Sequence, residues 1–282
     1  MKLSSAHLVA AAWFFAPAFS ARADNWAPNL TMTATWQDNA TNANAASDRI
    51  GALQTGADFL ASQRYGVGRD DSFFLTAHLG AEWWPRFDGL TTGLAGARVE
   101  WRHKFGLGAY APVFSVEAAG DAVAARESGR RGTATGVTAA LRQRLTDEWR
   151  ATLIQEFSQF YAQGAVFDRS AGTTALEIDR DLTDVTRLTF RASYRDGDIV
   201  SYGRPPRPDL VGLASHRLAV DTFGDSRVAY SIAAHTVGLK AGVTHALDQN
   251  SALLFSFEML TTNRGSLSYV NHLVSLVLVH QY

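Results

Sequence analysis

Cysteine is absent from the 282 residues, which excludes disulfide frameworks, thiolate metal sites and cysteine nucleophiles. Charged residues are few, at 19%, and 26 Lys and Arg are balanced by 27 Asp and Glu. The chain therefore has no basic surplus to hold phosphates, and we expect no nucleic-acid partner. After residue 24 the sequence also lacks any run of about 18 apolar residues, so no later segment qualifies as a membrane-spanning helix.

The first 23 residues have the pattern of a secretory signal peptide. Lys2 supplies a positive charge, and Ala21-Arg22-Ala23 is a small-x-small cleavage site before Asp24. The alternative is a transmembrane anchor, but the apolar run at residues 8–19 has only about 12 residues and contains Pro17, whereas a spanning helix needs about 20. The sequence thus predicts a signal peptide at 1–23 and an exported mature chain at 24–282.

The mature chain alternates apolar and polar residues with a period of two, which is typical of β-strands. Between 185 and 195, for example, Leu188 and Phe190 share one face, whereas Arg187 and Arg191 share the other. Glycine is frequent, at 23 residues, and suits many strand connections better than helices. The alternation predicts twelve strands, at 30–38, 50–65, 72–84, 90–105, 109–121, 133–145, 149–162, 173–181, 185–195, 227–247, 252–262 and 267–282.

The connections between these strands alternate between short ones and a second class that is mostly longer, the longest at 196–226. This alternation is typical of transmembrane β-barrels, which have short periplasmic turns and longer extracellular loops. Nearly every strand also reaches the roughly 9 to 11 residues that cross a bilayer. We therefore predict an all-β fold, a closed antiparallel transmembrane β-barrel of about twelve strands spanning 24–282. The alternatives are a secreted β-sandwich and, if 215–223 forms another hairpin, a barrel of fourteen strands.

Aromatic and proline positions support the barrel. Two aromatic girdles are expected at the membrane interfaces. The set near the predicted periplasmic ends consists of Tyr65, Phe73, Phe105, Tyr110, Trp149 and Tyr282. The set near the opposite ends consists of Trp36, Trp83, Tyr161 and Tyr194. Prolines mostly avoid the strands: Pro28 precedes the first strand, and only Pro112 falls inside one, where it would cost a hydrogen bond of the sheet.

The C-terminus carries a resemblance to a known class of proteins. Val274, Leu276, Leu278 and Tyr282 alternate up to a terminal aromatic residue. This pattern resembles the final strand of Gram-negative outer-membrane β-barrels, with His280 where such strands usually have an aromatic or apolar residue. Residues 36–43 (Trp-Gln-Asp-Asn-Ala-Thr-Asn-Ala), followed by Ser-Asp at 47–48, look like the first hairpin of a group of little-characterised outer-membrane barrels. The resemblance implies a location in the cell outer membrane, contact with its lipid, and Tyr282 as a signal to the assembly machinery.

If the apolar phase faces lipid, the other phase lines a lumen. The predicted pore-lining residues are Arg98, Arg102, Arg142, Arg144, Arg187, Arg191, Arg195, Glu100, Glu156, Glu177 and Asp179. One interpretation is a network of cross-strand ion pairs that fills a polar interior. The other is a water-filled pore in which rows of arginine attract anionic solutes, with Arg187, Arg191 and Arg195 as the strongest row. Glu177 and Asp179 on the preceding strand could neutralise that row.

The connection at 196–226 has two interpretations. It is either an exposed loop stiffened by its prolines or a segment that folds into the barrel mouth or binds a partner. The candidates for a constriction are Arg204, Arg207 and Asp209.

The sequence contains no Gly-x-Ser-x-Gly, no His-Glu-x-x-His, no phosphate-binding glycine loop with lysine and no calcium-loop spacing. His78 and Glu82 both fall on the lumenal phase, but a metal would need more ligands beside them. We therefore predict no enzymatic activity, no metal and no cofactor. The favoured function is a passive channel or transport conduit for small hydrophilic solutes, with anionic solutes as a further hypothesis. The alternatives are a closed structural or adhesion-type barrel that acts through its loops and, less favoured, a lipid-modifying enzyme.

Overall fold

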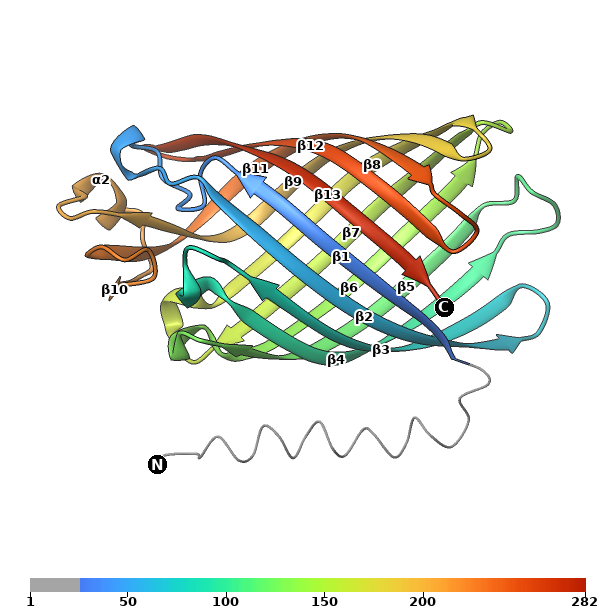
Figure 1. The fold of residues 1–282 in the computed structure, drawn as a ribbon, viewed down its shortest axis with the longest axis horizontal. Helices are drawn as coiled ribbons and strands as arrows, with labels where there is room; N and C mark the ends of the chain where they lie inside the picture. The colour runs from blue at the N-terminus through green and yellow to red at the C-terminus, as the bar shows by residue number, and fades with distance from the viewer. Residues whose placement is uncertain (1–25) are drawn as a thin grey trace.

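The computed structural model describes residues 26–282, so the predicted signal peptide at 1–23 lies outside the described residues. Thirteen strands form one antiparallel sheet, and twelve of them close into a barrel (Figure 1). The barrel strands are β1 (Ala27–Gln37), β2 (Ala52–Val67), β3 (Asp71–Trp83), β4 (Thr92–Lys104), β5 (Val113–Ala125), β6 (Gly132–Arg144), β7 (Trp149–Ala162), β8 (Arg169–Thr183), β9 (Thr186–Gly203), β11 (Arg227–Ala246), β12 (Ser251–Arg264) and β13 (Leu267–Gln281). The predicted closed antiparallel barrel is confirmed.

The barrel closes at two places. β1 pairs with β13 from Asn29↔Gln281 to Gln37↔Leu273, and β9 pairs with β11 across the longest connection. Every barrel strand therefore has two neighbours, which pairs the backbone polar groups as a strand in lipid requires. The start of β1 and the end of β13 lie at the same end of the barrel (Figure 1). We call this the periplasmic end and the opposite one the extracellular end. Among residues 26–282 no helix is long and apolar enough to cross a membrane.

The outer surface of the barrel is apolar. On β11, Val237, Leu239 and Val243 are exposed, whereas the residues between them alternate to the inner face. The ten aromatic side chains predicted for the two girdles are all exposed: Tyr65, Phe73, Phe105, Tyr110, Trp149, Tyr282, Trp36, Trp83, Tyr161 and Tyr194. An exposed apolar surface of this extent around a closed barrel suits contact with lipid rather than water.

Two prolines differ from the sequence expectation. Pro112 lies just before β5 rather than inside a strand, because the turn with Gly106 (φ 98°) and Gly108 (φ 92°) extends further than predicted. Its carbonyl accepts a hydrogen bond from the Phe105 N–H, so no bond of the sheet is lost. Pro28 lies inside β1 instead of before it, at the second residue of the strand, where a missing N–H is tolerated.

The connection predicted at 196–226 is shorter and more ordered than expected. Residues 196–203 continue β9 and pair with β11 up to Gly203↔Val228. The rest contains the one-turn helix α2 (Pro208–Val211) and the short strand β10 (His216–Val220). β10 pairs only with β11, from His216↔Ser231 to Val220↔Arg227. It forms an additional hairpin outside the closed ring, so the alternative of fourteen barrel strands is wrong.

Candidate functional site

All eleven residues predicted to line the pore lie on the inner face of the barrel. Their positions alternate with exposed outer residues such as Val99, Leu141, Phe157, Leu176 and Phe190. They are contributed by five strands: Arg98, Glu100 and Arg102 by β4, Arg142 and Arg144 by β6, Glu156 by β7, Glu177 and Asp179 by β8, and Arg187, Arg191 and Arg195 by β9. Their role toward a solute stays a prediction.

The predicted arginine row on β9 is partly neutralised by β8. The Nε of Arg187 donates to Asp181 at 2.6 Å, and Arg191 lies 3.9 Å from Glu177. Among residues 26–282 Arg195 has no carboxylate partner, and it donates instead to the backbone carbonyl of Asp198 at 2.8 Å. The periplasmic part of the row is therefore a cross-strand network of ion pairs, and only its extracellular end has a cation without a carboxylate in contact.

A second polar cluster crosses the inner face from β2 to β5. The ring of His78, which is buried, lies 3.0 Å from Asp58 and 3.1 Å from Asp121, and Arg98 contacts it at 3.3 Å. Gly96 on β4 pairs with both His78 and Asp121, and because it has no side chain the ring can extend over β4. The sequence placed His78 and Glu82 on the same lumenal phase, and the structure shows that the contacts of His78 are with two aspartates. Among the described residues no group of three or more His, Asp and Glu is arranged to hold a metal.

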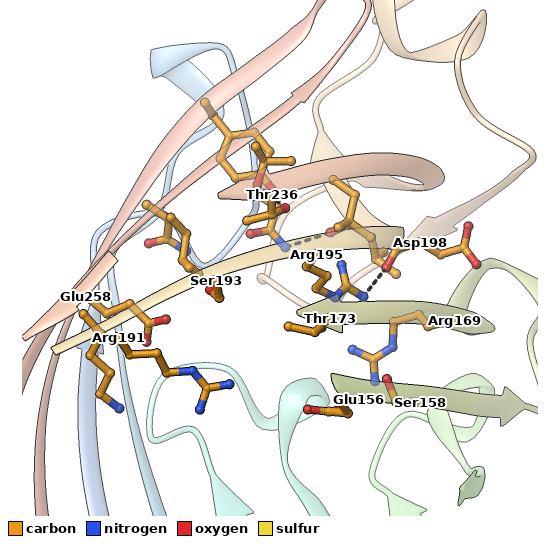
Figure 2. Close-up of a pocket in the computed structure, with 18 residues that line it drawn as sticks. Glu156, Ser158, Arg169, Thr173, Arg191, Ser193, Arg195, Asp198, Thr236 and Glu258 are labelled. Carbon is orange, nitrogen blue, oxygen red and sulfur yellow. Dashed lines mark hydrogen bonds between the residues drawn. The ribbon is translucent and has the colours of Figure 1, made fainter. Parts of the chain in front are cut away.

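A cavity of about 520 Å³ lies in the extracellular half of the lumen (Figure 2). Its charged lining consists of four basic and three acidic side chains: Arg169, Arg191, Arg195 and Lys240, and Glu156, Asp198 and Glu258. The rest of the polar wall consists of the hydroxyl groups of Ser158, Thr173, Ser193, Thr236, Thr262 and Tyr269 and the amide groups of Asn42 and Asn271. Of the lining residues, Arg169 was missed by the sequence because it falls in the predicted connection at 163–172, whereas β8 begins at this residue. The cavity is a polar space that suits water and hydrophilic solutes.

The extracellular mouth above this cavity is covered by a hydrophobic core built from connections, from β10 and from the extracellular ends of β2, β9 and β11. We call this core the cap, and it consists of Ala52, Trp84, Phe87, Leu90, Val166, Phe167, Tyr202, Val220, Phe223 and Ala229. The ring of Phe223 contacts those of Phe87 and Tyr202, with centroids 5.0 and 4.9 Å apart. Phe87 belongs to the β3–β4 connection and Phe223 to the β9–β11 connection. Six strands, β4 to β9, separate these connections in a ring of twelve. Segments from opposite sides of the barrel therefore meet over its mouth.

Charged contacts fix the β9–β11 connection against the β1–β2 connection. Arg207 pairs with Asp48 at 2.5 Å and Asp209 at 2.6 Å, and it also donates to Asn44. The hydrogen bonds from Arg207 lower the pKa of Asp209 to about 2. Arg204 pairs with Asp225 at 2.9 Å. Arg207 and Asp209 thus hold the two connections together, whereas the ion pair of Arg204 lies within its own connection. None of these three predicted constriction residues lines the cavity.

Arg227 completes this contact between the connections. Its side chain is buried, and it donates to Asp225 at 2.5 Å and to the backbone carbonyl of Asp48 at 2.8 Å. Through these charge-assisted hydrogen bonds, Arg227 at the start of β11 contacts both the β9–β11 connection and the β1–β2 connection.

No protein-family model matches the chain, and no curated protein sequence does. Among solved structures, an outer-membrane channel from Pseudomonas putida F1 aligns with a TM-score of 0.60 at 9% identity, over 92% of this chain and 96% of that one. The chain has the fold of outer-membrane channels. Two porins align less well. The porin NanC aligns at 7% identity over 90% of this chain and 100% of the other, with a TM-score of 0.47. The porin KdgM, in a complex with oligogalacturonate, aligns at 10% identity over 90% of this chain and 99% of the other, with a TM-score of 0.46. Likeness at this level of identity shows the fold of the barrel and nothing about its solute.

Proposed function

We propose that this barrel is a channel for small hydrophilic solutes in the outer membrane and that the cap controls its extracellular entrance. The observation that carries the proposal is the polar cavity of about 520 Å³ inside a closed barrel. A barrel that served only as a scaffold could fill its lumen with packed side chains, as narrower barrels do. A cavity lined by charges and hydroxyls offers a solute the hydrogen bonds that it loses on leaving water.

The cap favours a gated channel over a permanently open one. Its aromatic contacts join connections from opposite sides of the mouth, so a solute coming from the extracellular end meets a packed hydrophobic core before it reaches the cavity. Connections of this kind are held by fewer contacts than the sheet and open at lower free-energy cost. Passage through the barrel therefore requires the cap to move while the strands stay paired.

Liposome swelling tests the channel function. Vesicles that contain the refolded mature chain should swell faster than empty vesicles in small neutral sugars, and the rate should fall with solute size. Folding is checked by heat modifiability, because a closed barrel resists detergent until it is boiled. Swelling no faster than that of empty vesicles, from protein that is folded and inserted, would refute the channel.

A closed barrel that acts through its extracellular connections is the second candidate, and the cap is the observation that favours it. In that case the cap is a permanent surface for a partner rather than a gate. A variant with a loosened cap separates the two: it should increase permeability in a gated channel and leave it unchanged if the lumen below is blocked as well.

The cellular partners follow from the same fold. We propose that the exposed apolar surface contacts outer-membrane lipid and that Tyr282, which is 68% exposed beside the ring of His280, is read by the assembly machinery. Replacing Tyr282 with serine should then reduce the amount of folded barrel in the outer membrane without changing the stability of barrels refolded in vitro. Equal membrane levels for the variant and the native chain would exclude this role.

A further inference from the structure

Three arginines lie together where the cavity meets the cap. Arg169 starts β8, Arg195 lies on β9, and Arg130 belongs to the β5–β6 connection. Arg169 and Arg195 both line the cavity, and their side chains extend toward the same space (Figure 2). The positive charges of Arg130 and Arg195 both act on the Arg169 guanidinium. Arg169 and Arg195 thus face the same part of the lumen, and Arg130, which does not line the cavity, adds its charge from the β5–β6 connection.

None of these three guanidinium groups has a carboxylate within 4.0 Å among residues 26–282. Arg130 donates to the hydroxyl of Tyr202 at 2.6 Å and lies over the ring of Phe167. Arg195 donates to a backbone carbonyl, and Arg169 only stacks on Phe160, 5.2 Å from the ring centroid. Arg191, the remaining arginine of the cavity lining, differs in that it lies 3.9 Å from the carboxylate of Glu177.

Acidic groups do face the cluster, at longer range. Glu82 acts on Arg169, and Glu156 and Asp198 act on Arg195. The carboxylate of Asp198 already accepts a hydrogen bond from the Ser170 N–H at 3.0 Å. The acids therefore moderate the positive field without occupying the donors of the guanidinium groups. Arg169 is exposed and Arg195 is half-buried, and both line the cavity, so their free donors are accessible to a ligand or to water.

We propose that Arg169 and Arg195, with the charge of Arg130 acting on them at longer range, form a binding subsite for an oxyanion, the carboxylate or phosphate group of a small polar solute. The guanidinium fork matches both groups because it donates two parallel hydrogen bonds to their oxygens. The cavity of about 520 Å³ equals the liquid volume of about 17 water molecules, at roughly 30 Å³ each. It therefore has room for a whole organic acid or phosphorylated solute. Ser158 and Thr173 provide neutral donors and acceptors beside the arginines.

The subsite names the substrate class of the channel and therefore rests on the proposed function. Anion binding to the subsite can nevertheless be measured without transport. Isothermal titration calorimetry on the refolded barrel in detergent uses inorganic phosphate and succinate as probes and succinamide as the neutral control. The native chain should bind both anions and not succinamide. Arg169→Gln and Arg195→Gln should each weaken binding about tenfold or more, since a hydrogen bond to a charged group contributes about 1.5–3 kcal/mol.

Arg64→Gln is the matched control, because Arg64 donates to Ser72 near the periplasmic end of β2 and lies outside the cavity lining, and it should change the affinity less than about twofold. Each variant is first checked for heat modifiability, and the two cavity variants give independent results if one fails to fold. Absence of anion binding by the native chain would overturn the proposal, as would an equal loss in Arg64→Gln. Anion binding by a barrel that is silent in vesicles would refute the channel and leave the subsite standing.

Discussion

Replacing Phe167 with alanine should open the cap and leave the barrel folded. Phe167 is 2% exposed, and its ring packs against Gly129 and lies 5.2 Å from the Arg130 guanidinium. Truncating a buried phenylalanine costs about 3–5 kcal/mol, and losing the cation–π contact adds about 0.5–1 kcal/mol. This loss of free energy destabilises the closed state of the cap rather than the barrel, because Phe167 lies between β7 and β8 and not in the ring of paired strands. A loss of about 3 kcal/mol raises the ratio of open to closed cap about 100-fold.

Single-channel recording in a planar bilayer measures this directly, as the fraction of time spent open. The matched control is Phe157→Ala, which removes the same atoms from a side chain that is 54% exposed on the outer face of β7. We expect a large increase in open time for Phe167→Ala and none for Phe157→Ala, with both proteins still heat-modifiable. Unchanged open time in a folded Phe167→Ala barrel would refute the reasoning that cap packing limits entry.

Two further predictions concern the connections and the outer face. Asp209, whose pKa is lowered to about 2, stabilises the β9–β11 connection above its unfolded pKa of about 3.9, and this contribution is lost as the pH falls toward 2. Asp209→Asn should therefore increase pepsin cleavage of that connection at pH 4 but not at pH 2, and an equal difference at both pH values would contradict the pairing. Leu239 lies on the outer face near the middle of β11, where arginine should cost about 2–4 kcal/mol in lipid. Guanidinium unfolding of Leu239→Arg in vesicles measures this cost, with Lys240→Gln as the inward control, and similar stability of Leu239→Arg and the native chain would argue against a lipid-facing surface.

The strands could be predicted because each barrel strand has one face toward an apolar exterior and one toward a polar lumen. This arrangement imposes the period of two that is visible along β9 in Leu188 and Phe190 against Arg187 and Arg191. Prediction failed where local preference and tertiary pairing disagree. Asp196, Gly197 and Asp198 have the composition of a turn, yet the structure pairs Gly197 with Ala171 and Ala234 on the two neighbouring strands.

The candidate site was only partly predictable. The inner face of β9 followed from alternation, and the neutralising role of Glu177 toward the arginines was anticipated. The cap was not, because its contacts join connections that are far apart in sequence, such as Phe87 and Phe223. A local signal was nevertheless present. Phe87 and Phe167 are large apolar residues in connections that should otherwise be polar, and such residues indicate that connections pack on one another.

The central claim is that the cap must move for a solute to pass, and a disulfide across the cap tests it most directly. A Cβ added at Gly89 would lie 3.6 Å from the Cβ of Thr222, within the range of about 3.5–4.5 Å that disulfides use. The chain has no native cysteine, so Gly89→Cys with Thr222→Cys can form one defined bond between the β3–β4 and β9–β11 connections. We predict that the oxidised barrel is silent in a planar bilayer and that a reducing agent restores the conductance of the native chain. Equal conductance in the oxidised and reduced states would contradict the claim.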